Sequence, residues 1–267
     1  MKLATALLSL GAVMVAQSDR TSASSSMAVA LRDPTAIAMV QTVLRSSGAA
    51  QVPVDAIAVG TLRTTVAGKS SDTPITVKSK GSQLLRTEMQ QPTGTSISII
   101  NHGHGTLQRP NGKVMELLTN NTFVERADHI PIFSLLAEYE ESGMSVENLG
   151  STTVMGRPAN IVALRPLPQP NISQAMLDQY ISKTKFYIDE ISNEVVKIER
   201  TNYAENDTSF GQKFEIYLSN YQSINGVLVP FRQTEFHDEK LDSDLILQSV
   251  TFNNGLSDTE FTLPEQN

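Results

Sequence analysis

Hydrophobic and polar residues alternate along most of this chain after Val59, a spacing that is typical of β-strands with one buried and one exposed face. Runs of this kind occur between residues 60 and 118, between 144 and 201, and at 214–221, 227–237 and 245–253. In all they predict about ten strands. Because few helix-length patterns separate them, we expect consecutive strands to pair antiparallel.

Two short patterns sharpen this expectation. Asn225-Gly226 lies between two β-rich runs and predicts a tight hairpin, because both residues tolerate a positive φ at little cost. In the run 96–101 the order Ser96, Ile97, Ser98, Ile99 places both serines on one face of a strand and both isoleucines on the other. We interpret the isoleucine face as the dry one.

Apolar residues return to helical spacing in two places. Over 34–47 they follow Asp33-Pro34, an N-cap residue and a proline at the first helical position, and Gly48 is placed to end the helix. Over 128–142 a second apolar pattern predicts a helix between two groups of strands. It either covers the mouth of a curved sheet or simply packs on the sheet with a solvated acidic end.

The N-terminal 16 residues combine Lys2, an apolar run and a polar stretch that follows it, which is the layout of a cleaved signal peptide. Residues 17–32 are rich in Ser and Ala and predict a flexible leader. Residues 33–267 are long enough to bury one large core as a single domain.

Composition narrows the partners and the compartment. The chain has no cysteine, so disulfides and a lipid-modified cysteine are excluded. Its formal net charge is −7 and it has no cluster of Lys or Arg, which makes nucleic acid a poor partner. We therefore expect a periplasmic or secreted protein with no stable membrane insertion after removal of the signal.

The order of these elements resembles the LolA-like group of periplasmic lipoprotein-sorting and lipid-binding proteins. The resemblance covers roughly 33–264 and is carried by the N-terminal helix, the interrupted meander and a C-terminal pattern that includes Tyr221, Gly226, Pro230 and Phe231. It implies an α+β fold, a curved and unclosed antiparallel β-barrel with helices on the concave side. It also implies that acyl chains of lipids or lipoproteins bind in that concavity.

Acyl binding needs a dry concave surface and no charged pair, at ~0.8 kcal/mol per buried CH₂. Apolar residues on the predicted strands and on the second helix are the candidate lining: Leu62, Ile97, Ile99, Phe133 and Leu136. The alternative for each is ordinary packing in the core.

Catalytic and metal signatures are weak. The sequence has no Gly-x-Ser-x-Gly elbow, no phosphate-binding glycine loop and no His-Glu-x-x-His segment. His102 and His104 are spaced like two metal ligands, but the third ligand that a site needs is not indicated. We expect no catalytic residues, no metal and no cofactor.

Three classes of function follow. The first is a non-enzymatic, exported binding protein that carries a lipid or a lipoprotein acyl chain in an apolar groove. The second is a sensory or assembly module of the cell envelope that binds a protein or peptide partner. The third is an unrecognised hydrolase, such as a glycosidase whose carboxylate pair the sequence does not single out.

Overall fold

The computed structural model describes residues 30–48, 53–66, 68–117, 130, 133–167, 183–204 and 207–263. The predicted signal peptide over 1–16, most of the predicted leader and the first part of the predicted helix over 128–142 lie outside these residues. Among the described residues, no helix combines the length and the apolar character that crossing a membrane requires.

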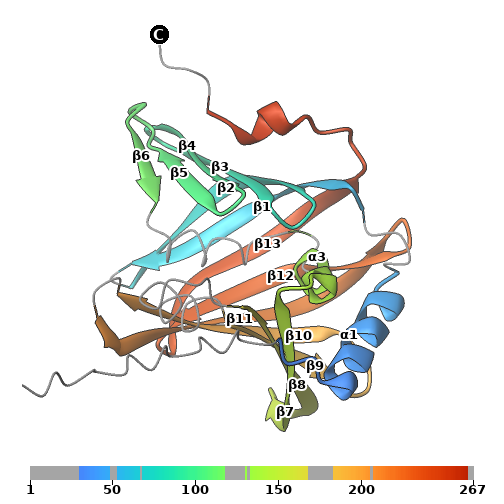
Figure 1. Ribbon diagram of the computed structural model, residues 1–267. Helices are drawn as coiled ribbons and strands as arrows, with labels where there is room; N and C mark the ends of the chain where they lie inside the picture. The colour runs from blue at the N-terminus through green and yellow to red at the C-terminus, as the bar shows by residue number, and fades with distance from the viewer. Residues whose placement is uncertain are drawn as a thin grey trace, which may run out of the picture.

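The described strands form one antiparallel sheet of thirteen (Figure 1), in the order β6-β5-β4-β3-β2-β1-β13-β12-β11-β10-β9-β8-β7. Their bounds are β1 Asp55–Val66, β2 Lys69–Lys80, β3 Leu84–Gln91, β4 Gly94–Asn101, β5 His104–Gln108, β6 Val114–Leu117, β7 Met144–Val154, β8 Arg157–Pro166, β9 Thr184–Asp189, β10 Val195–Ala204, β11 Asp207–Ile224, β12 Val227–His237 and β13 Lys240–Phe252.

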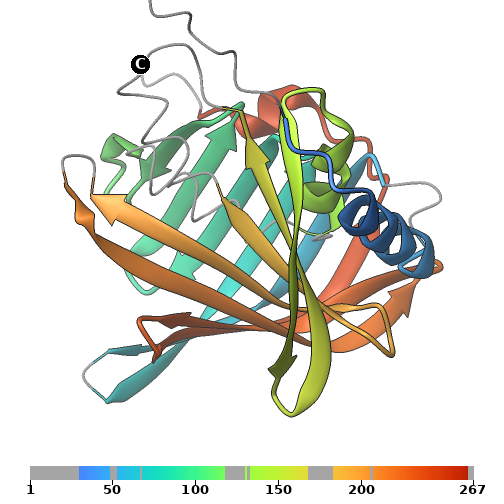
Figure 2. The same cartoon turned by 60° about the horizontal axis from the view of Figure 1, so that its bottom comes forward.

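This sheet curls strongly on itself, so that β1–β4 lie across the interior from β7–β9 (Figure 2). In the described part of the chain β6 and β7 are edge strands and no pairing joins them, so the sheet stays open. The predicted curved, unclosed antiparallel architecture is confirmed, but with thirteen strands in place of about ten. The predicted runs between 60 and 118 include the short strands β5 and β6, which pair with each other and, through β5, with β4.

The predicted hairpin is confirmed at Asn225-Gly226, where φ is 52° and 85° and β11 turns into β12. The predicted first helix is α1, Pro34–Ser46. Asp33 caps it by accepting a hydrogen bond from the backbone N–H of Ala36. Gly48, at φ 75°, follows the helix, and a Cβ there would lie 1.8 Å from the carbonyl oxygen of Gly226. The close approach of α1 to the hairpin therefore depends on this glycine.

The helices cover one half of the concave face. Within the predicted span 128–142 the structure describes α3, Phe133–Ala137, and the 3₁₀ turn η3, Glu138–Glu140. Val40 and Val43 of α1 and Leu136 of α3 pack into one buried cluster with inward-facing residues of β7–β11, such as Phe186 and Ile216. The remaining concave surface, over β1–β5 and β12–β13, carries the site described below.

Both ends of the described chain are pinned to the sheet. Leu31 and Arg32, within the predicted flexible leader, lie beside β7, where the Val146 N–H donates to the carbonyl oxygen of Leu31. The Arg32 side chain also donates to the carbonyl oxygen of Tyr139 in η3 at 2.6 Å. The C-terminal end is held by Asp55, at the start of β1, whose carboxylate accepts hydrogen bonds from the backbone N–H groups of 254–256. Burial acts to raise the pKa of Asp55, but these hydrogen bonds outweigh it and lower the pKa.

Behind this anchor the chain continues into η4, Asp258–Phe261, which lies on the convex face of the sheet. Phe261 is 1% exposed and packs with Leu84 and Ile99. Lys78 and Lys80 of β2 add ion pairs to Glu260 and Asp258 at 2.9 and 2.6 Å. The C-terminal segment therefore covers the outer apolar face of β3 and β4.

Candidate functional site

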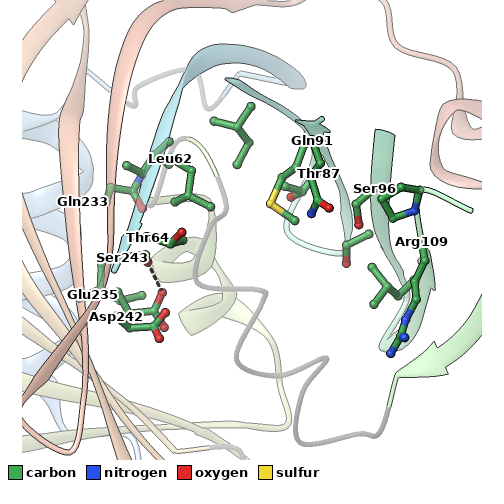
Figure 3. Close-up of a pocket in the computed structure, with 17 residues that line it drawn as sticks. Leu62, Thr64, Thr87, Gln91, Ser96, Arg109, Gln233, Glu235, Asp242 and Ser243 are labelled. Atoms are coloured by element: carbon green, nitrogen blue, oxygen red, sulfur yellow. Dashed lines mark hydrogen bonds between the residues drawn. The ribbon is translucent and has the colours of Figure 1, made fainter. Parts of the chain in front are cut away.

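A hollow of about 510 Å³ opens on the part of the concave face that α1 and α3 leave uncovered (Figure 3). Its wall comes from β1–β5 and from β11–β13, two groups of strands far apart in the sequence that the pairing of β1 with β13 joins into one surface. The described lining residues are Leu62, Thr64, Ile75, Thr87, Met89, Gln91, Ser96, Ser98, Leu107, Arg109, Pro110, Ile216, Gln233, Glu235, Asp242, Ser243 and Leu245.

Strand register explains why these side chains share one wall. Leu62 lies opposite Leu245 in the β1–β13 pair, and Met89 lies opposite both Ile75 and Ser96 in its two pairs. Residues directly opposite one another in an antiparallel pair point to the same face of the sheet. One face of the meander thus runs without interruption from β13 through β1 to β4.

The lining combines apolar and polar side chains. Leu62, Ile75, Met89, Leu107 and Leu245 supply aliphatic and thioether surface. Hydroxyl and amide side chains lie between them on the same wall. Cavities of this size, mostly apolar with a few polar groups, are typical of sites for small hydrophobic ligands.

One rim of the hollow is acidic. Glu235 accepts a hydrogen bond from the Ser243 hydroxyl at 3.3 Å, and its other oxygen lies 2.8 Å from Nε2 of His237. Asp242 lies 3.7 Å from Nδ1 of the same ring. The hydrogen bond with Glu235 raises the pKa of His237; partial burial opposes this, and the charges of Glu235 and Asp242 add to it. Arg109 lies across the mouth on the opposite wall (Figure 3).

Glu235, His237 and Asp242 are also the described group whose ligand atoms lie within 4.8 Å of one another, close enough to hold one metal ion. The two ring nitrogens of His237 lie 2.8 Å from Glu235 and 3.7 Å from Asp242, so the three side chains form one charged cluster. His102 and His104, the pair considered from the sequence, lie exposed in and beside the β4–β5 turn, away from this group.

Gln233 is the buried polar group of the hollow. Its side chain is on β12 between Leu218 and Leu245 of the neighbouring strands and is 4% exposed. The buried Nε2 atom has no hydrogen-bond partner among the described residues. An amide donor buried without a partner costs roughly 1–3 kcal/mol, so this residue is an exception to the usual pairing of buried polar groups.

The five predicted lining residues are divided by the fold. Leu62 lines the hollow. Ile97 and Ile99 lie on the opposite, convex face of β4 against Phe261, and Ser96 and Ser98 of the same strand face the hollow. The isoleucine face of β4 is dry, as expected, but it lies on the convex side, where the C-terminal segment covers it; the prediction that Ile97 and Ile99 line the concave groove is therefore wrong.

Leu136 is buried in the packed cluster beneath α1 and is not part of the hollow, and the side chain of Phe133 lies outside what the structure describes. A contact of these residues with a ligand therefore stays a prediction. Gln233 is not among the lining residues predicted from the sequence. A signal for it was present, because Val229, Phe231 and Gln233 alternate along β12 and place an amide on an apolar face.

A second charged network lies on the convex face, away from the hollow. Lys197 of β10 pairs with Glu199 and Glu215 at 2.9 and 2.5 Å, and Tyr187 donates to Glu199 at 2.8 Å. Burial acts to raise the pKa of Glu199, but hydrogen bonds from Lys185, Lys197 and Tyr187 outweigh it and lower that pKa to about 2. Every charge in this network has a partner, so no charge is buried there without compensation.

No family model matches the sequence, and no curated protein matches it detectably. Solved structures do. A domain from Vibrio parahaemolyticus named for outer membrane lipoprotein sorting aligns with a TM-score of 0.58 at 13% identity, covering 84% of this chain and 95% of the domain. A DUF1329 family protein from Desulfovibrio piger aligns with a TM-score of 0.56 at 12% identity, covering 85% and 97%.

A LolA superfamily protein from Nitrosomonas europaea aligns with a TM-score of 0.55 at 13% identity and covers 84% of this chain and 97% of that one. At such identities the likeness concerns the fold and does not transfer an activity. This chain therefore has the fold of the LolA-like proteins.

Proposed function

We propose that this protein is an exported, non-enzymatic binding protein that holds the acyl chain of a lipid or of a lipoprotein in the hollow of the concave face. The observation that carries the proposal is the hollow itself: about 510 Å³ of space lined by Leu62, Ile75, Met89, Leu107 and Leu245. The fold shared with a domain named for lipoprotein sorting and with a LolA superfamily protein supports it.

The energetics suit such a ligand. Each methylene group removed from water contributes about 0.8 kcal/mol, so ten buried methylenes contribute roughly 8 kcal/mol before the entropic costs of association. Leucine, isoleucine and methionine side chains supply such a surface without any directional contact. Methionine adapts its shape to irregular ligands, and Met89 is one of the lining residues.

The proposal places the protein in the periplasm or outside the cell, as the predicted signal peptide indicates. A role in sensing or assembly through a protein partner is the alternative, and a defined protein recovered from envelope extract without lipid would favour it. The non-enzymatic role is tested with chromogenic acyl esters, whose turnover by the purified protein would contradict it.

A charge placed in the wall tests the binding site directly. Leu62→Asp puts a carboxylate where a methylene chain would lie, and we expect affinity for a fluorescent acyl probe to fall at least about tenfold, because burying an unpaired charge is costly. Native mass spectrometry after gentle isolation should show bound acyl species on the wild type and little on the variant.

Ile246→Asp is the matched control. Ile246 is next to Leu245 on β13 but is exposed on the convex face, so the same charge there should leave probe binding unchanged. Equal loss of binding in both variants would point to unfolding. Undiminished binding in Leu62→Asp would refute the assignment of the hollow as the acyl site.

A further inference from the structure

The buried side chain of Gln233 indicates which chemical group of the ligand would lie beside the apolar wall. We propose that its side-chain amide is a specificity-determining group that donates a hydrogen bond to the carbonyl oxygen of an acyl ester or amide. The hollow would then select esterified or amide-linked acyl chains over alkyl chains that lack the carbonyl. This inference rests on the proposed function and deepens it.

Three observations carry the inference. Gln233 lines the hollow beside Leu62 (Figure 3), and it is more than nine-tenths buried. Its Nε2 has no partner in the described part of the chain, although amides buried in proteins are normally hydrogen-bonded. Its cross-strand neighbours, Leu218 and Leu245, offer no acceptor from their side chains. A ligand oxygen in the hollow would complete the missing bond.

The surroundings of Gln233 also fix the orientation of the ligand. Along β12 the inward-facing residue on one side is Phe231 and on the other side is Glu235, so the amide marks the boundary between the apolar wall and the acidic rim. A carbonyl held there would direct its acyl chain along Leu62 and Leu245 and its head group toward the rim.

The acidic rim would favour binding of an ester over binding of a free fatty acid. Glu235 and Asp242 lie on the same side of the hollow as Gln233, and the carboxylate of a fatty acid would approach two like charges there. Arg109 lies on the opposite wall and does not offset this approach. An uncharged carbonyl accepts the amide hydrogen bond without that repulsion.

A matched pair of probes tests the proposal: monopalmitoylglycerol carries the carbonyl, and 1-O-hexadecylglycerol has the same chain and head group joined by an ether. Displacement of a fluorescent acyl probe from the full chain measures both affinities. We expect the wild type to bind the ester about fivefold more tightly, the size of one net hydrogen bond. Gln233→Leu should bring the ratio to about one by weakening the ester alone.

Gln248→Leu is the matched control, because Gln248 is exposed on the convex face of β13 and should leave the ratio unchanged. Equal affinities in the wild type, or a preference that survives Gln233→Leu, would overturn the inference and leave the proposed function standing. A wild type that binds neither probe would instead refute the proposed function, and the inference with it.

A ligand-free measurement checks the premise independently. If Nε2 of Gln233 has no partner, Gln233→Leu removes an unsatisfied buried donor, and the melting temperature should stay the same or rise. A lowered melting temperature would show that the amide is already paired in the free protein and would overturn the inference.

Discussion

Substitutions at Ile99 and at Leu62 should have opposite effects: the first should lower stability and leave ligand binding intact, and the second should lower ligand binding. This contrast tests which face of the meander is convex and which is concave. Ile99 is 2% exposed and packs with Phe261 and Leu84 on the convex side. Ile99→Ala leaves a cavity there, and substitutions of this kind cost 2–5 kcal/mol, with the loss set by how far the neighbours relax.

We expect a cost of about 3 kcal/mol for Ile99→Ala, near the middle of this range. For a chain of this size that corresponds to a melting temperature lowered by roughly 6–12 °C. Thermal unfolding followed by circular dichroism measures it. Affinity for the fluorescent acyl probe should stay within about twofold of the wild type at a temperature where both are folded.

The contact itself is tested by combining Ile99→Ala with Phe261→Ala. Because the two side chains share one cluster, the double variant should lose less stability than the sum of the single variants, by at least about 0.5 kcal/mol. An unchanged melting temperature together with a tenfold loss of probe affinity in Ile99→Ala would refute the reasoning. It would mean that the isoleucine face of β4, and not the serine face, meets the ligand.

Three further predictions concern the charged groups. Glu235 raises the pKa of His237 above its unfolded value, so the contribution of His237 to stability is fully present below about pH 6.5 and is lost as the pH rises through the folded pKa. The difference in unfolding free energy between the wild type and His237→Gln should therefore shrink over that pH range. A constant difference would contradict the prediction. Asp55→Ala should cost about 2–3 kcal/mol at neutral pH by leaving three backbone N–H groups without their acceptor. Because the pKa of Asp55 is lowered, urea titrations should show the stability difference between wild type and variant disappearing as the pH falls from 3.8 through the folded pKa. A difference that persists in strong acid would argue against the assigned hydrogen bonds. Lys197→Met should cost roughly 1–3 kcal/mol, because Glu199 and Glu215 lose a shared buried cation but keep Lys185 and Lys213. A second substitution, Glu199→Gln, should recover part of that loss in chemical denaturation, and failure to recover any would exclude charge as the cause.

The sequence by itself determined the local structure. Alternation placed the strands, because side chains of a strand point to opposite faces with a period of two. Asn225-Gly226 fixed its hairpin and Asp33-Pro34 fixed the start of α1, because these residues act through their own backbone preferences. The antiparallel meander follows from strands that succeed one another without helices.

The tertiary structure alone decided which face of each strand is concave. Alternation separates Ser96 and Ser98 from Ile97 and Ile99 but does not say which pair looks inward, because an apolar face is equally well buried by the core or by a segment from elsewhere in the chain. Here the segment around Phe261 covers the isoleucines, and the pairing of β13 with both β1 and β12 places Gln233 and Leu62 on either side of Leu245. Such contacts join residues more than a hundred positions apart, and no local preference encodes them.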